Sequence, residues 1–171
     1  MARSLGMAQR ILTLLFGLAV ISVTAPTFAC SCRWQGTFET VAKKAPVVVK
    51  AKVVGTKSFD PALIMGLDET KQEAFQAIAV EVAEVLKGSF GNWRLELLGD
   101  NGFECRLYLL ASRFVIGDEY LFVLRSDLPT QELSICGEHW VRVQGSSYLG
   151  QDLAGEGYQQ PLNLLRENLT R

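Results

Sequence analysis

Residues 47–54 have the sequence Val-Val-Val-Lys-Ala-Lys-Val-Val, and this stretch determines the fold class that we expect. β-Branched side chains favour extended backbone, because they pack well on the pleated surface of a sheet. The stretch runs into Gly55, a residue type that commonly bounds a strand. It therefore predicts a β-strand.

Similar strand patterns follow along the chain. Between residues 75 and 86 the side chains alternate, with Ile78, Val80 and Val82 on one face. Further strands are predicted at residues 93–98, 120–124 and 140–143. The sequence Gly-Asp-Asn-Gly after the second of these four strands and Gly-Asp-Glu before the third are turn signals. Several short strands separated by turns predict a mainly β, antiparallel barrel or sandwich.

Two short helices are expected beside the strands. The first follows the N-cap Thr37, ends at Pro46 and has an apolar stripe. That stripe consists of Phe38, Val41, Ala42 and Ala45. The second helix spaces leucines at i, i+3 and i+7, namely Leu162, Leu165 and Leu169. Residues 56–73 predict a long polar loop to which the sequence assigns no role.

The first 29 residues have the three parts of a secretory signal peptide. Arg3 and Arg10 supply positive charge without any acid, and residues 11–23 form an uncharged, mainly apolar run. Residues 27–29, Thr-Phe-Ala, place small side chains at the −3 and −1 positions of a signal peptidase site. We expect cleavage before Cys30 and a secreted product, either extracellular or periplasmic.

Two alternatives for this N-terminal segment fit less well. A membrane anchor needs about 20 apolar residues to cross a bilayer, and the apolar run is shorter and is followed by Pro26. A lipoprotein would also start at Cys30, but it would need an aliphatic residue at Thr27 and a small one at Phe28. The mature chain is therefore expected to have no membrane attachment.

The mature chain is expected to act without nucleic acid and without catalysis of its own. Residues 30–171 contain 15 Lys and Arg against 18 Asp and Glu, a net charge of about −3, without a basic run. Nucleic acids and anionic membranes need a clustered basic face. The sequence also lacks a Ser/His/Asp arrangement, a phosphate-binding loop and an H-E-x-x-H motif. Its length is that of one domain.

All four cysteines lie after the expected cleavage site, at positions 30, 32, 105 and 136. An even count in an exported chain predicts a disulfide framework, and four cysteines allow three pairings. The bridges could be purely structural. Two other uses are a redox C-x-C pair and a metal site made by Cys30, Cys32 and His139. His139 is the only histidine, and we expect it at the surface or at a strand end.

Cleavage after Ala29 would give Cys30 a free α-amine next to its own carbonyl oxygen. An α-amine has a pKa of roughly 8, so part of it is neutral at physiological pH. A neutral amine and a carbonyl oxygen can together bind zinc, and a catalytic zinc keeps one position open for water. A terminus held rigid by bridges at Cys30 and Cys32 could displace that water with little loss of entropy.

The mature start Cys30-Ser31-Cys32, directly behind a signal peptide, resembles the N-terminal inhibitory domain of the tissue inhibitors of metalloproteinases. Residues 47–54, 82–88 and 117–121 are also similar to that family, and the resemblance covers most of residues 30 to 145. It implies a five-stranded, OB-type antiparallel barrel, the netrin-like module, with flanking short helices over residues 30–171. The third disulfide of the animal proteins has no counterpart here.

The resemblance also implies roles for single residues. It pairs Cys30 with Cys105 and Cys32 with Cys136. Cys30 would chelate the catalytic zinc of a target metalloproteinase, and Ser31 would enter its specificity pocket. Secondary contacts would come from Cys32, Arg33, Phe103 and Glu104. The chain would be an inhibitor with no cofactor of its own; the alternative is a netrin-like interaction module that inhibits no protease.

Other conspicuous side chains have expected structural roles. Trp34, Trp93 and Trp140 are expected to pack in the core or at a barrel end. Glu81 and Glu84 are three residues apart, so on a regular strand they would face opposite sides. That arrangement would exclude an acid/base pair.

Overall fold

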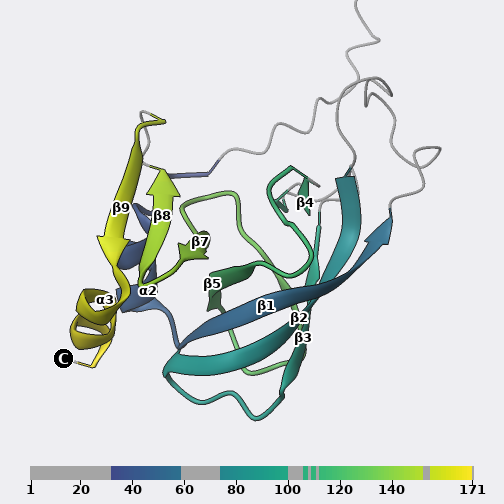
Figure 1. Ribbon diagram of the computed structural model, residues 1–171, viewed down its shortest axis with the longest axis horizontal. Coiled ribbons are helices and arrows are strands. Elements are labelled where there is room, and N and C mark those ends of the chain that lie inside the picture. The colour runs from purple at the N-terminus through teal and green to yellow at the C-terminus, as the bar shows by residue number, and fades with distance from the viewer. Residues whose placement is uncertain are drawn as a thin grey trace, which may run out of the picture. The chain divides into compact units, whose positions relative to one another are not determined.

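Strands dominate the part of the chain that the computed structural model describes, namely residues 32–58, 74–99, 106–107, 109–110, 112–151 and 155–170 (Figure 1). These residues belong to one of two compact units, which spans residues 31–171. The signal-peptide prediction, Cys30, Ser31, Cys105 and most of the 56–73 segment lie outside the described residues.

The described residues of this unit form nine strands and two helices. The strands are β1 (Val47–Ser58), β2 (Ala74–Lys87), β3 (Arg94–Leu98), β4 (Leu109–Leu110), β5 (Glu119–Leu124), β6 (Thr130–Glu132), β7 (Trp140–Gln144), β8 (Ser147–Gln151) and β9 (Gly157–Pro161). The helices are α2 (Phe38–Lys44) and α3 (Leu162–Leu169). The four strands predicted after residue 74 are confirmed within two residues at each end, and both predicted helices are confirmed.

All these strands form one mixed sheet, with the order β6-β3-β2-β1-β5-β7-β8-β9 and with β4 paired to β2. The β3–β6 pair is parallel, and the other pairs are antiparallel. The mainly β prediction is therefore confirmed. Among the described residues no ladder joins β6 to β9, so the sheet is open there. The closed five-stranded barrel stays a prediction.

The predicted last strand, residues 140–143, is in fact followed by a hairpin. A turn at Gly145, whose φ is +60°, joins β7 to β8, and β9 pairs with β8. The sequence analysis missed these two strands because β9 contains Gly, Gln and Pro, which have weak strand propensity. As an edge strand, β9 can hold Pro161 without loss of a central ladder bond.

The long strand β1 contributes to both faces of the sheet, because successive side chains alternate. Val47, Val49, Ala51 and Val53 enter a core with β2, β3 and β5. Val48 enters a second core on the other face, which α2 and α3 cover. β5 is buried on both faces, with Tyr120, Phe122 and Leu124 in the first core and Leu121 and Val123 in the second. The two helices thus cover this outer face of the sheet, and a second hydrophobic core forms between the helices and the strands.

A β-bulge in β2 changes the expected position of its acids. Lys50 lies opposite Glu84 and Lys52 opposite Glu81, while the register shifts by one residue between them. The extra residue puts Glu81 and Glu84 on the same face, so the expectation of opposite faces was wrong. The Glu84 carboxylate accepts hydrogen bonds from Nε and Nη2 of Arg166, at 3.0 and 2.7 Å, and these bonds attach α3 to the sheet.

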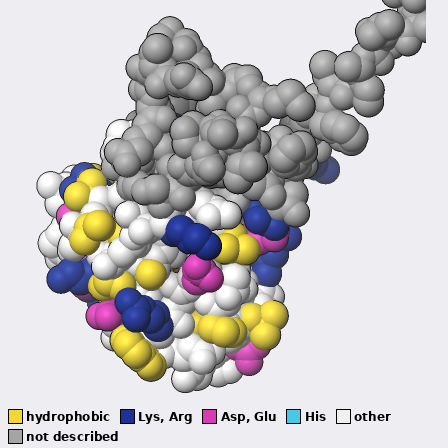
Figure 2. Space-filling view, turned by 90° about the vertical axis from the view of Figure 1, so that its right-hand side faces the viewer, with side chains coloured by type: hydrophobic (Ala, Val, Ile, Leu, Met, Phe, Trp, Pro, Cys, Tyr) yellow, Lys and Arg dark blue, Asp and Glu magenta, His cyan; other side chains and the backbone are white. Residues whose placement is uncertain are grey.

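The surface shows no gathering of basic side chains where it can be seen. On the face in Figure 2, Lys and Arg lie beside Asp and Glu, with small apolar patches between them. Within the described ranges, no helix is both long and apolar enough to span a bilayer.

Candidate functional site

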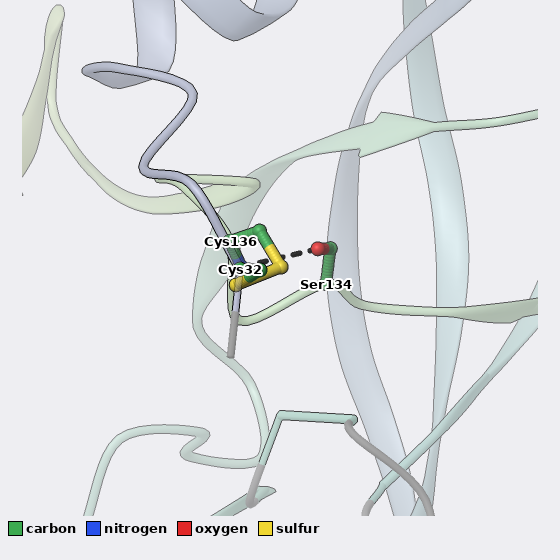
Figure 3. The surroundings of a disulfide bond; sticks show 3 residues. All are labelled: Cys32, Ser134 and Cys136. Atoms are coloured by element: carbon green, nitrogen blue, oxygen red, sulfur yellow. Dashed lines mark hydrogen bonds between the residues drawn. A yellow bond between two sulfur atoms is a disulfide. The ribbon is translucent and has the colours of Figure 1, made fainter. Parts of the chain in front are cut away.

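A disulfide joins Cys32 to Cys136 and fixes the start of the described chain to the loop before β7 (Figure 3). The two Cα atoms are 5.6 Å apart, and the two residues are 104 positions apart in sequence. The Cys136 amide donates to the Oγ of the buried Ser134 at 3.1 Å, which orders the loop around the bridge. The structure thus contains one of the two bridges that the resemblance implies. The other, Cys30–Cys105, lies outside the described residues.

Backbone hydrogen bonds extend this attachment beyond the bridge. The Gln35 amide donates to the Cys136 carbonyl at 2.8 Å, and the Glu138 amide donates to the Gly36 carbonyl at 3.1 Å. Gly137 lies between these bonds with a φ of +156°, and a Cβ there would come within 3.1 Å of the Gln35 Cβ. The absence of a side chain therefore allows the two segments to approach closely. Residues 32–36 are held by one covalent bond and two hydrogen bonds.

Glu138 connects this loop to α2, which is early in the chain, and to β8 and β9, which are late in the chain. Its carboxylate accepts the Phe38 amide at the start of α2 at 2.8 Å, and also the Tyr158 hydroxyl and the Gln151 amide. Burial, followed by the hydrogen bond to Glu138, raises the pKa of the Tyr158 hydroxyl well above its ordinary value. Sequence reasoning missed Glu138, because its partners on β8, β9 and α2 are distant in sequence.

His139 lies beside this loop, but it is not at the surface as expected. Its side chain is only 6% exposed, and its Nε2 has no hydrogen-bond partner among the described residues. Its carbonyl accepts the Val123 amide at 2.9 Å, so it directly precedes β7 beside β5. The predicted position of His139 at a strand end is confirmed, and its predicted position at the surface was wrong. No cluster of three His, Cys, Asp or Glu side chains forms within the described ranges.

The environment of His139 predicts a pH-dependent stability. Burial, with a smaller effect of Arg125, lowers the pKa of His139 to about 4 from its ordinary 6.5. Because the folded-state pKa is the lower one, stability is complete above pH 6.5 and is lost as the pH falls towards 4. The loss should reach about 3 kcal/mol. His139→Gln should remove most of this pH dependence of the unfolding free energy.

The chain has a single histidine, so its imidazole NMR resonances need no further assignment. A titration midpoint near 4 would agree with the buried site. A midpoint near the ordinary value of about 6.5 would contradict it.

The remaining predicted site residues divide between described and undescribed positions. Cys32 and Arg33 are described and exposed. Cys30, Ser31, Phe103, Glu104 and Cys105 lie outside the described residues.

The three tryptophans do not share one role. Trp140 packs on Phe114, with ring centroids 4.6 Å apart, as expected for a core contact. Trp34 is half-buried in the segment after Cys32. Trp93 is 67% exposed beside Arg94, whose guanidinium carbon is 5.6 Å from the ring centroid, so the packing prediction was wrong for this residue.

No protein-family model matches the chain, and the comparison with curated proteins finds no relative. The family resemblance of the mature N-terminus therefore rests on the residues themselves.

Proposed function

We propose that the chain is a secreted protein inhibitor of zinc metalloendopeptidases, and that it acts through the mature N-terminus. The α-amine and carbonyl oxygen of Cys30 would occupy the open coordination position of the target's zinc, and Ser31 would enter the adjacent specificity pocket. The chain would supply no metal or cofactor of its own, and no residue of the chain would react. The target protease is the partner.

The observation that carries this proposal is the attachment of residues 32–36. The Cys32–Cys136 bridge and the hydrogen bond from Gln35 to the Cys136 carbonyl fix the backbone two residues beyond the proposed terminus. A ligand that is already ordered loses less entropy on binding than a free peptide does. This is the property that a chelating terminus requires. Exposure of Cys32 and Arg33 agrees with a contact surface at this point.

The strand order supports the finer fold proposal, a five-stranded OB-type barrel of the netrin-like class. β1 pairs with its sequence neighbour β2 and also with the distant β5. Such non-sequential pairing is a feature of Greek-key barrels, and OB barrels are themselves partly open. In this proposal the additional β8–β9 hairpin and α3 cover the outer face. Cys30 would pair with Cys105, and Phe103 and Glu104 would lie beside the terminus.

The exported protein tests the proposal directly. Its intact mass, measured with and without alkylation, should correspond to a chain that begins at Cys30 and has no free thiol. This form should inhibit at least one member of a panel of secreted zinc endopeptidases. A mass that includes residues 1–29 would contradict the expected terminus. Absence of inhibition by a protein with a free Cys30 amine would favour the netrin-like interaction module.

A further inference from the structure

A groove of about 680 Å³ lies beside the attached N-terminal segment. Trp34 lines it from that segment, Glu138 from the loop after Cys136, and Trp140 and Arg142 from β7. Arg113 contributes from the turn before β5. The volume falls within the range of roughly 300–1,000 Å³ that is usual for ligand sites. In Figure 1 the strands that form one wall, β7 and β8, lie next to each other near α2.

Among the described residues that line the groove, two are basic, Arg113 and Arg142, and one is acidic, Glu138. The exposed Arg113 has no ion pair or side-chain hydrogen bond within the described residues, and Arg142 has one partner, Asp118, at 2.5 Å. The Glu138 carboxylate, the acid that lines the groove, already accepts the Phe38, Gln151 and Tyr158 donors. An indole can only donate a hydrogen bond, and a guanidinium has five donors and no acceptor. The groove therefore suits an acceptor-rich, negatively charged ligand.

The walls of the groove also carry apolar residues beside the two arginines. The apolar residues Trp34, Trp140 and Leu149 line the same space. A carboxylate can bind a guanidinium through two parallel hydrogen bonds, and an apolar neighbour can pack on the rings. A peptide segment that carries Asp or Glu next to an apolar residue meets both requirements.

We propose that this groove binds an acidic surface loop of the target metalloproteinase, with the loop's carboxylate held by Arg113 and Arg142. The inference rests on the proposed function, because the groove borders the segment that follows Cys30 and would face the rim of the protease cleft. Charges at such a rim mainly steer association and set the choice of partner. The groove would thus select among proteases that share the same zinc chemistry.

Reversing the charge of Arg113 in the mature protein, residues 30–171, tests the groove. Arg113→Glu should raise the inhibition constant about tenfold or more at low salt, mainly through slower association, and the difference should shrink at high salt. Arg113→Lys should lose less, because it keeps the charge but not the two-pronged geometry. The matched control is Arg94→Glu on β3, which three strands, β2, β1 and β5, separate from β7 in the sheet. It should change inhibition less than about twofold.

A second measurement separates the groove from the zinc contact. Protein acetylated at the Cys30 amine should still bind the protease surface weakly, in a salt-dependent way, and Arg113→Glu should abolish that binding. If the mature protein inhibits proteases but Arg113→Glu behaves like Arg94→Glu in both assays, the groove inference alone is wrong. If the protein with a free Cys30 amine inhibits none, the proposed function and this inference both fail.

Discussion

An alanine added before Cys30 is expected to lower affinity for the target protease by several powers of ten, while the domain stays folded. The added residue moves the α-amine away from the carbonyl oxygen of Cys30, so the two can no longer chelate one zinc ion together. A metal bond inside a cleft that excludes water is then lost. Acetylation of the amine should have the same effect, because an amide nitrogen is a poor zinc ligand. Inhibition constants measure the loss of affinity, and urea unfolding of the same samples measures whether the domain stays folded.

Substitutions at Ser31 are the control for this experiment, since they leave the amine intact. Ser31→Gly removes one side-chain contact, so inhibition should weaken less than in the extended form and unequally across proteases. Ser31→Arg should clash with most specificity pockets. Equal inhibition by the alanine-extended and the mature protein would show that Cys30 does not bind the zinc.

Cys136→Ser is expected to lower the free energy of unfolding by about 4 kcal/mol, because the bridge restricts a long loop in the unfolded chain. The bridge joins residues 104 positions apart, which is most of the described domain. Loss of about 4 kcal/mol is a large part of a typical domain's stability, so export should fall as well. Denaturant unfolding of the purified protein measures the change. The folded fraction should also inhibit less, since residues 32–36 lose their covalent attachment.

Cys32→Ser and Ser134→Ala are the matched variants for this prediction. Cys32→Ser breaks the same bridge, so it should cost as much as Cys136→Ser. Ser134→Ala removes only the 3.1 Å hydrogen bond from the Cys136 amide and should cost about 1 kcal/mol. Loss of less than about 1 kcal/mol in both cysteine variants would mean that the bridge contributes little to the folded state.

Local patterns in the sequence were sufficient for most of the secondary structure. The valine-rich run at residues 47–54 became the central strand β1, and the leucine spacing near the C-terminus became α3. These predictions succeed because backbone preference and the period of buried side chains act within a few residues. The position of Cys32 opposite Cys136 followed only from the family resemblance, because four cysteines leave the pairing open.

Long-range packing decided the features that no local pattern predicts. The bulge in β2 moved Glu84 onto the face of Glu81, and it is the pairing with β1 that sets this register. Glu138 became a connection point because strand pairing and helix docking bring Phe38, Gln151 and Tyr158 to one carboxylate. The sequence by itself determined both helices and the strands β1, β2, β3, β5 and β7, but not the short or edge strands β4, β6, β8 and β9. Only the tertiary structure decided how residues 32–36 are held and that a groove lined by two arginines lies beside them, because these depend on contacts between segments far apart in the chain.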